Sequence, residues 1–273
     1  MSPAAGEEKR IGVREFRARK QSGTPLVVVA AYDALFARLS DEAGVDAVLV
    51  GDSLGMVIDG RESTVPVTLD QMIYHGASAR RGISRAMLIV DMPFLTCSLG
   101  EQRAMVNCGR VMQETGAHAV KIEGGDVQMA RSISAVVRLG IPVMGHLGFT
   151  PQSVNTIGGF RVQGRDEDSA QRLIDEARRL EDAGAYAIVL ELMPAAVAQA
   201  VTDAVGIPTI GIGAGAGCDG QVLVLFDLLG LTDRFSPKFL KRYATMAEDV
   251  RTAVRRFRDD VVAGEYPDAD HSF

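Results

Sequence analysis

The chain has 273 residues, of which 47% are hydrophobic and 23% are charged, and its formal net charge is −6. This balance is that of a globular protein and excludes a disordered or fibrous chain, while the mild acidity argues against nucleic acid or an anionic membrane as a partner. Apolar runs end after about seven residues, well short of the ~18 that a membrane-spanning helix needs. The three cysteines, Cys97, Cys108 and Cys218, form no CxxC pair. We therefore expect a soluble cytoplasmic protein with reduced thiols.

Short apolar runs recur along the chain, and most of them follow a glycine that ends an amphipathic stretch. These glycines are Gly44, Gly82, Gly116, Gly140, Gly184 and Gly206. Each suits the left-handed residue that closes a helix, and each apolar run suits a strand buried on both faces. We predict strands at residues 26–33, 47–52, 87–94, 119–125, 142–148, 187–194, 208–213 and 222–226.

Helical patterns separate most of these strands. After Gly100, one helix face carries Ala104, Met105, Cys108, Val111, Met112 and Thr115. From Asp168, another carries Leu173, Ala177 and Leu180. Strand–helix alternation repeated about eight times, with no linker rich in proline and serine, predicts parallel βαβ units. We expect an α/β fold, a single TIM (β/α)8 barrel that forms one domain over residues 1–273, with an N-terminal helix.

Two segments fall outside this alternation. Residues 149–165 are rich in Gly, Asn and Gln, and so long a loop inside a compact domain predicts an active-site lid. Residues 236–263 predict a C-terminal helix with Ser236 as its cap and Pro237 in its first turn. Its apolar residues recur every three or four positions and pack either on the chain's own barrel or on a neighbouring subunit.

Polar residues stand at the carboxyl ends of the predicted strands, where this architecture carries its catalytic groups. In chain order they are Asp33, Asp52, Asp91, Lys121 with Glu123, His146 and Glu191. Asp52, Asp91 and Glu123 come from three successive strands, which are spaced about 4.8 Å apart. Three carboxylates without cysteine favour Mg²⁺, with Mn²⁺ or another divalent ion as the second choice. The alternative is that each acid caps a helix or pairs with an arginine.

Glu191 stands two strands further round, between two leucines, and partial burial there suits a general base. The alternative is a structural ion pair with Lys121. His146 donates either to a substrate oxygen or to the backbone. Ser53, directly after Asp52, offers its backbone N–H or its hydroxyl to an anion.

The glycine cluster at residues 211–216 (GIGAGA) matches a permissive dinucleotide-binding fingerprint. It lies late in the chain and no convincing helix follows it directly, so it lacks the setting of that motif. A close-approach loop on the seventh strand explains these glycines better.

Several short motifs occur in a fixed order. They are VGDSLGM (50–56), DMPF (91–94), VKIEGG (120–125), GHLG (145–148), TPQSVN (150–155), VLE (189–191) and GIGAG (211–215). With this set, residues 17–273 resemble the 3-methyl-2-oxobutanoate hydroxymethyltransferase (ketopantoate hydroxymethyltransferase) family, whose fold is a TIM barrel of the phosphoenolpyruvate/pyruvate superfamily. The resemblance implies transfer of a hydroxymethyl group from 5,10-methylenetetrahydrofolate to 3-methyl-2-oxobutanoate, giving 2-dehydropantoate for pantothenate biosynthesis.

The resemblance also implies roles for individual residues. Asp52 and Asp91 would bind Mg²⁺, with Glu123 completing the site directly or through water, and Glu191 would be the proton acceptor. Contacts with the keto acid are implied for Asp52, Ser53, Asp91 and Lys121, with His146 as a further candidate. The family assembles as a homodecamer, which the C-terminal helix could serve. Some members carry His where this chain has Phe226, which leaves the contribution of the eighth strand open.

Two other functions fit parts of the pattern. A carbon–carbon lyase acting on a 2-oxo or 2-hydroxy diacid would use the same barrel and metal, but it would want more arginine for a second carboxylate than these strand ends carry. A non-catalytic barrel that binds a metabolite would need neither three metal-binding acids nor a separate base.

Overall fold

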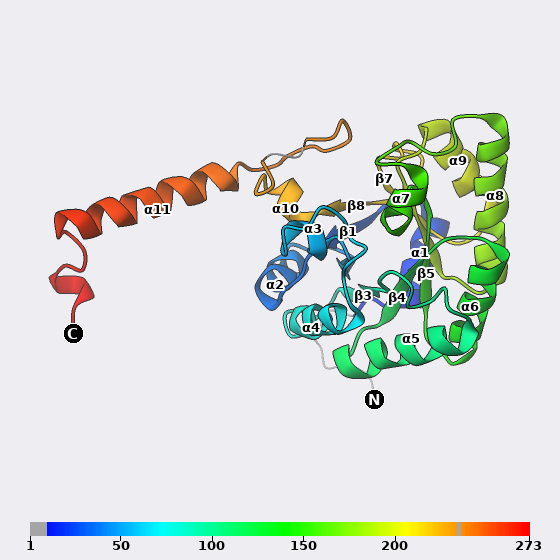
Figure 1. The fold of residues 1–273 in the computed structure, drawn as a ribbon, viewed down its shortest axis with the longest axis horizontal. Helices are drawn as coiled ribbons and strands as arrows, with labels where there is room; N and C mark the ends of the chain where they lie inside the picture. The colour runs from blue at the N-terminus through cyan, green and yellow to red at the C-terminus, as the bar shows by residue number, and fades with distance from the viewer. Residues whose placement is uncertain (1–9, 234–235) are drawn as a thin grey trace. The chain divides into compact units, whose positions relative to one another are not determined.

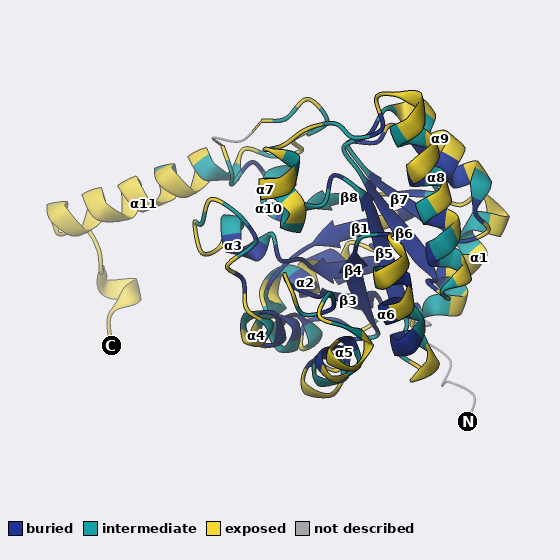
Figure 2. Ribbon diagram, turned by 45° about the vertical axis from the view of Figure 1, so that its right-hand side comes forward, coloured by how far each residue is buried: buried dark blue, intermediate teal, exposed yellow. Residues whose placement is uncertain are grey.

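The computed structural model describes residues 10–233 and 236–273, and in these residues eight parallel strands pair in chain order and close into a barrel (Figure 1). The strands are β1 (Leu26–Ala30), β2 (Ala47–Val50), β3 (Met87–Asp91), β4 (Ala119–Glu123), β5 (Val143–Gly148), β6 (Ala187–Glu191), β7 (Thr209–Ile212) and β8 (Gly220–Val224). Figure 2 shows the strands buried inside a ring of helices that are exposed on their outer sides. The predicted α/β TIM barrel is confirmed.

Most predicted strands run too far at their carboxyl ends. The first is predicted to reach residue 33, but β1 ends at Ala30, and β3 ends at Asp91 instead of residue 94. The reason is that the residues after the last paired position turn away to begin the next helix. Asp33, for example, accepts a hydrogen bond from the backbone N–H of Phe36 at 2.9 Å and caps the following helix, so it is not part of a strand-end site.

Helices connect the strands, beginning with the expected N-terminal helix. They are α1 (Val13–Ser22), α2 (Ala34–Glu42), α3 (Leu54–Val57), α4 (Leu69–Arg80), α5 (Glu101–Thr115), α6 (Val127–Arg138), α8 (Glu167–Asp182) and α9 (Ala195–Ala204). Helix α8 buries the three predicted residues Leu173, Ala177 and Leu180. Residues 213–219, all of which the structure describes, contain no helix, so β7 leads directly into β8.

The six glycine junctions divide into two kinds. Gly44, Gly116, Gly140 and Gly184 have positive φ and are the left-handed residues that the pattern predicts. Gly82 and Gly206 do not have positive φ, so the prediction is wrong for these two. At Gly82 the reason for glycine is space, because a Cβ there would lie 2.2 Å from the carbonyl oxygen of Ala34.

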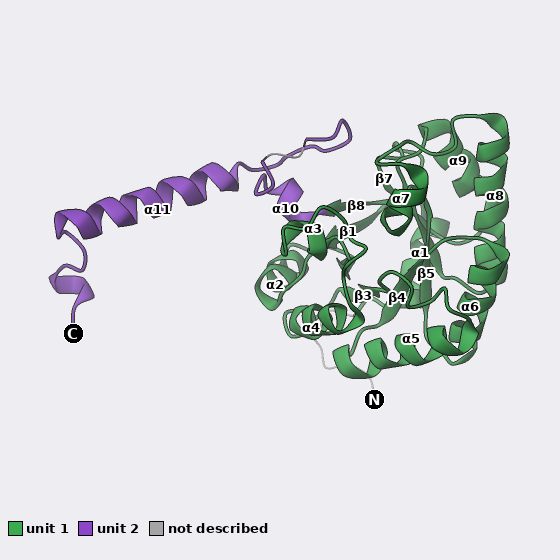
Figure 3. Ribbon diagram, in the orientation of Figure 1, with its two compact units in different colours: residues 1–223 green, residues 224–273 purple. Residues whose placement is uncertain are grey.

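The chain separates into two compact units, residues 1–223 and 224–273 (Figure 3). The second contains α10 (Leu225–Leu228), which includes Phe226, α11 (Met246–Ala263) and η2 (Ala269–His271). Helix α11 begins at Met246, and the predicted start at residue 236 is wrong. The backbone N–H groups of Tyr243 and Met246 bond to the carbonyls of Leu228 (2.8 Å) and Leu229 (3.0 Å), so these two groups are not available for helix bonds within the stretch. The single domain over residues 1–273 stays a prediction.

The apolar residues of α11 are not buried. Val250, Val254, Phe257 and Val261 are all exposed, and no residue of the helix is buried. Whether they pack on the chain's own barrel or on a neighbouring subunit also stays a prediction. Within the described residues, no helix combines the length and the apolar character that crossing a lipid bilayer demands.

Candidate active site

The pairing register of the barrel places the predicted site residues side by side. Asp91, at the end of β3, pairs with Lys121 on β4, and Glu123, at the end of β4, pairs with His146 on β5. Gly148 at the end of β5 pairs with Glu191 at the end of β6. Because the strands are parallel, all these side chains lie at one end of the barrel.

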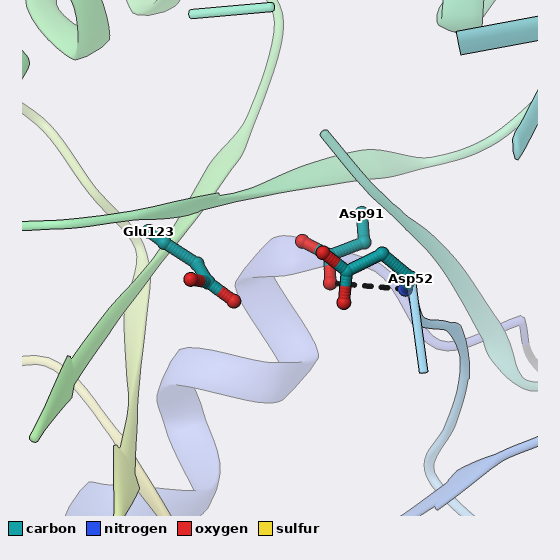
Figure 4. Close-up of side chains that lie close together, drawn as sticks. All are labelled: Asp52, Asp91 and Glu123. Carbon is teal, nitrogen blue, oxygen red and sulfur yellow. Dashed lines mark hydrogen bonds between the residues drawn. The ribbon is translucent and has the colours of Figure 1, made fainter. Parts of the chain in front are cut away.

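Three buried carboxylates form a compact group there. Asp52, Asp91 and Glu123, which we call the acidic cluster, each offer an oxygen within 4.8 Å of the others. Figure 4 shows the three side chains converging from different strand ends, with the backbone N–H of Asp52 donating to Asp91 Oδ2 at 3.3 Å. The structure therefore brings together the three acids that the sequence selects.

Lys121 provides positive charge beside the cluster. Its Nζ lies 2.8 Å from Asp91 Oδ2 and 3.7 Å from Glu123 Oε1, and its side chain is only 4% exposed. Its ion pairs are with these two acids and not with Glu191, so the structural pair considered for Glu191 is not formed. One lysine faces three carboxylates, which leaves the cluster short of positive charge.

Burial and charge shift the pKa values of these groups. Burial raises the pKa of Asp52 well above its usual range, and the charges of Asp91 and Glu123 raise it further. Burial also raises the pKa of Asp91 and of Glu123, against the opposing effect of Lys121. For Lys121 burial acts to lower the pKa, but the three acids outweigh it and the pKa is raised. The cluster therefore favours an added proton or an added cation.

The oxygens of the cluster are unequally satisfied. Asp91 Oδ2 accepts from Lys121 and from the backbone N–H of Asp52. By contrast, Asp91 Oδ1 and Glu123 Oε1 are buried and make no hydrogen bond. A buried oxygen without a hydrogen bond costs about 1–3 kcal/mol, and for Glu123 Oε1 the ion-pair contact with Lys121 at 3.7 Å offsets part of this cost. Hard carboxylate oxygens aimed at one point are the ligands that Mg²⁺ and Mn²⁺ prefer, so the residues present fit such an ion.

His146 connects the cluster side of the site to Glu191. Its Nδ1 lies 3.1 Å from Lys121 Nζ, and its Nε2 lies 3.2 Å from Glu191 Oε2, an ion-pair distance without the geometry of a hydrogen bond. Burial and the charge of Lys121 lower the pKa of His146, so the ring is neutral. Nδ1 also lies 3.4 Å from Glu123 Oε1. A lysine ammonium only donates, so the shorter contact with Lys121 favours the tautomer in which Nδ1 accepts and the ring proton is on Nε2, on the side of Glu191. Among the described residues, the contacts of the His146 ring are with side chains and not with the backbone, and its contact with a substrate oxygen stays a prediction.

Glu191 is separate from the acidic cluster and more accessible. Its side chain is 17% exposed against 3% for His146. Its backbone is held by β5, because the N–H of Phe149 donates to the Glu191 carbonyl at 2.8 Å. Gly148, with φ +93°, allows this approach, since a Cβ there would lie 2.2 Å from the same carbonyl oxygen. The base candidate is therefore fixed in the main chain but open at its carboxylate.

Ser53 lies beside the cluster and contacts a residue that the sequence analysis missed. Its Oγ is 2.9 Å from the hydroxyl of Tyr32, whose side chain is fully buried. Tyr32 lies within the first predicted strand, directly before Asp33 at its end. This position at a strand end is the signal that could have marked Tyr32 as a site residue. The substrate contact of Ser53 stays a prediction.

The predicted lid at residues 149–165 contains two short helical turns, η1 (Pro151–Ser153) and α7 (Val154–Ile157), and is not wholly loop. It supplies a second residue that was missed, Gln152, whose side-chain amide donates to Asp52 Oδ2 at 2.9 Å. Gln152 stands in the TPQSVN motif directly after the fifth strand, which was the available signal. Whether the segment closes over the site stays a prediction.

The glycine cluster at residues 211–216 is explained by close packing. A Cβ on Gly215 would lie 2.5 Å from the Cβ of Ala195, and one on Gly211 would lie 3.0 Å from Cys218 Sγ. No helix follows in residues 213–219, which the structure describes in full. The close-approach interpretation is confirmed.

Comparison with known proteins identifies relatives over almost the whole chain. The model of a family described as ketopantoate hydroxymethyltransferase matches residues 10–269. The 3-methyl-2-oxobutanoate hydroxymethyltransferase of Syntrophus aciditrophicus (strain SB) is 49% identical over 265 residues, which cover 97% of each chain. That of Trichlorobacter lovleyi is 51% identical over 265 residues, covering 97% of this chain and 99% of the relative.

Solved structures with the same fold are more distant in sequence. A phosphonopyruvate hydrolase, solved with oxalate and Mg²⁺, is 14% identical with a TM-score of 0.62 and covers 95% of this chain and 92% of its own. A 2,3-dimethylmalate lyase of the PEP mutase/isocitrate lyase superfamily is 18% identical with a TM-score of 0.61, covering 94% and 91%. These likenesses show that the chain shares the barrel fold of these proteins.

Proposed function

The chain belongs to the ketopantoate hydroxymethyltransferase family, and on that premise we propose that it transfers a hydroxymethyl group from 5,10-methylenetetrahydrofolate to 3-methyl-2-oxobutanoate, forming 2-dehydropantoate. The observation that carries the proposal is the acidic cluster, with two buried oxygens that make no hydrogen bond, beside a fourth carboxylate that lies outside it. A cation site and a separate base are what loss of a proton next to a keto group needs.

Asp52 and Asp91 would hold Mg²⁺, with Glu123 completing the site directly or through water. When bound, Mg²⁺ would supply positive charge to the keto and carboxylate oxygens of the 2-oxo acid and stabilise the negative charge that develops as the methine proton leaves. Mn²⁺ or another divalent ion would serve the same purpose. Lys121 adds a permanent positive charge for the anionic substrate, and Ser53 offers a hydroxyl to one of its oxygens.

Glu191 is the proposed proton acceptor. Its Oε2 faces His146, so Oε1 is the oxygen that would take the proton from the methine carbon. His146 Nε2 lies 3.2 Å from Glu191 Oε2, where its proton would help to orient the carboxylate, and we keep His146 as a candidate substrate contact as well. The reaction consumes one water, which supplies the oxygen of the hydroxymethyl group as the methylene carbon leaves both folate nitrogens at the oxidation level of formaldehyde. The electron-rich carbon attacks this carbon to form the new C–C bond, and the new hydroxyl oxygen takes up a proton. We propose that residues 149–165 keep bulk water out of the site during the attack.

We also propose that the chain acts in the cytoplasm as a homo-oligomer, a decamer by family resemblance. The exposed apolar residues of α11, Val250, Val254, Phe257 and Val261, are the surface that a second copy would cover. Its partners would be the keto acid and the folate, without nucleic acid or membrane. The mass in solution, measured by light scattering during size-exclusion chromatography, tests the oligomer.

Proton exchange in D₂O tests the chemistry without the folate. With Mg²⁺, the methine proton of 3-methyl-2-oxobutanoate should exchange and its NMR signal should disappear, and EDTA should stop this. Glu191→Gln should slow exchange by about 10²–10⁴-fold, the range of a general base. Glu167→Gln, at an exposed position in the first turn of α8, is the matched control and should exchange normally. Exchange at the wild-type rate by Glu191→Gln, or exchange at the same rate with Mg²⁺ and with EDTA, would contradict the proposal.

A further inference from the structure

Gln152 donates three hydrogen bonds to the acidic cluster and the backbone beside it. Within the described part of the chain, no other residue of segment 149–165 bonds to the cluster. Its Nε2 donates to Asp52 Oδ2 and to the carbonyl of Met92, both at 2.9 Å. Its backbone N–H donates to Glu123 Oε2 at 3.2 Å. One residue therefore bonds two of the three acids of the cluster and the main chain just after the third acid, Asp91.

Gln152 bonds one oxygen of each carboxylate that it contacts and leaves the other oxygen without a bond from Gln152. Gln152 bonds Oδ2 of Asp52 and Oε2 of Glu123, and Lys121 bonds Oδ2 of Asp91. Each acid thus accepts its hydrogen bond through one oxygen, and the other oxygens of Asp91 and Glu123 are the two buried atoms without a hydrogen bond, although Glu123 Oε1 has longer contacts with Lys121 (3.7 Å) and His146 (3.4 Å). A carboxylate held through one oxygen has its other oxygen aimed, which is how hydrogen bonds to metal ligands act in metalloproteins.

Gln152 belongs to the segment 149–165, which is also fastened to the base side of the site. The N–H of Phe149 donates to the carbonyl of Glu191 at 2.8 Å, and the rings of Phe149 and Phe160 pack at a tilt of 34° with their centroids 4.9 Å apart. The fully buried Phe149 thus joins the segment to the protein core.

We propose that Gln152 is a positioning residue that orients the carboxylates of Asp52 and Glu123 for a divalent cation and thereby couples the order of residues 149–165 to cation binding. This inference rests on the proposed metal site. Coupling of this kind is reciprocal: if the ordered segment improves the orientation of the ligands, cation binding must in turn favour the ordered segment.

Titration calorimetry with MgCl₂ alone tests the inference without the reaction. Gln152→Met keeps the volume and the backbone N–H but removes both amide bonds, and Gln152→Ala removes the side chain altogether. Each should raise the Kd for Mg²⁺ about tenfold or more, as loss of a hydrogen bond to a metal ligand does. Gln163→Met is the matched control, because its amide bonds only the carbonyl of Arg161 within the same segment, at 2.8 Å, and its Kd should be unchanged.

Hydrogen exchange of residues 153–160 is the second measurement. Mg²⁺ should slow exchange of these amides in the wild-type protein and in Gln163→Met, and it should have little effect in Gln152→Met. A wild-type Kd and wild-type protection in Gln152→Met would overturn the inference while leaving the proposed function in place. Absence of Mg²⁺ binding to the wild-type protein would overturn the proposed metal site and this inference together.

Discussion

The barrel holds buried acids at both ends of its strands, and the two groups differ in how their oxygens are used. At the amino ends, Asp41 accepts from the backbone N–H groups of Ser84, Arg85 and Ala86 at 2.6–3.3 Å, and both its oxygens are filled. Asp46, just before β2, also has both oxygens filled, by Arg19 and by a backbone N–H. In the acidic cluster at the carboxyl ends, two buried oxygens have no hydrogen bond.

This difference separates acids that build the fold from acids that await a ligand. A buried carboxylate whose oxygens all accept from the chain has completed its bonding and stabilises the segments that it joins. A buried carboxylate with an unused oxygen lowers stability until something binds it. The contrast can be tested by substituting one acid at a time and measuring both the stability of the fold and the rate of proton exchange.

Loss of an acid of the acidic cluster should have the largest effect of these changes. It should slow the reaction and leave the stability of the fold unchanged. Asp52→Asn removes a proposed cation ligand and should slow Mg²⁺-dependent proton exchange about 10³-fold, which corresponds to about 4 kcal/mol. Burial and its acidic neighbours raise the pKa of Asp52, so removing its charge should not lower the melting temperature in EDTA. NMR exchange and calorimetry measure the two quantities. A clear fall in melting temperature would place Asp52 with the fold-building acids.

Loss of an amino-end acid should affect stability instead. Asp41→Ala leaves three backbone N–H groups without their acceptor and should lower the free energy of unfolding by about 3 kcal/mol. Urea denaturation measures this loss, and proton exchange at 20 °C should stay near the wild-type rate. A variant as stable as the wild type but inactive would break the comparison.

The response to Mg²⁺ should depend on pH at the cluster. Because the folded-state pKa values of its acids are raised, the apo protein gains stability from these groups at low pH and loses it as pH rises through the raised values. Mg²⁺ binds the ionised form, so it should stabilise the protein more at pH 8 than at pH 5.5. At pH 8 the stabilisation should be about 2.7 kcal/mol when Mg²⁺ is at 100 times its Kd at that pH. Melting curves with MgCl₂ and with EDTA at both pH values measure this. An equal shift at the two pH values would be evidence against a cation bound by these acids.

The smallest effect should come from the edge of the site. Tyr32→Phe removes only the hydroxyl that contacts Ser53 and should raise KM for the keto acid about fivefold, or about 1 kcal/mol, with kcat little changed. Tyr74→Phe, at a side chain that is 73% exposed, is the control. Steady-state kinetics on both variants decide whether the Tyr32 hydroxyl orients Ser53 for the substrate, since an unchanged KM would assign it to packing.

The fold and the acidic cluster could be predicted because both depend on local pattern. Buried apolar runs mark the strands, and the parallel arrangement brings the strand ends together, so Asp91 and Glu123 meet although 32 residues separate them in the sequence. Gln152 could not be predicted in this way. It lies 100 residues from Asp52 along the chain, and its contact depends on how η1 turns after β5.

The start of α11 shows a second limit. Ser236 and Pro237 are good residues for beginning a helix. Further along, however, the N–H of Tyr243 is taken by the carbonyl of Leu228, a bond between segments that no local signal announces. Asp33 shows the same effect for a side chain. It follows the first strand as the site acids follow theirs, but its oxygen accepts the N–H of Phe36 and caps α2. Competition for backbone and side-chain hydrogen bonds, and not propensity, decided these positions.

Residues 149–165 consist of a few positions that are hydrogen-bonded to the site and a stretch between them that is not. Phe149 is bonded to the backbone of Glu191, Gln152 to the acidic cluster, and the N–H of Gln163 to the carbonyl of Leu192 at 2.8 Å. The stretch between Gln152 and Gln163 makes no such bond to the acids or to Glu191 among the described residues. Residues 153–162 can therefore differ between relatives without loss of these three bonds, whereas a change of the Gln152 side chain removes the bond to Asp52.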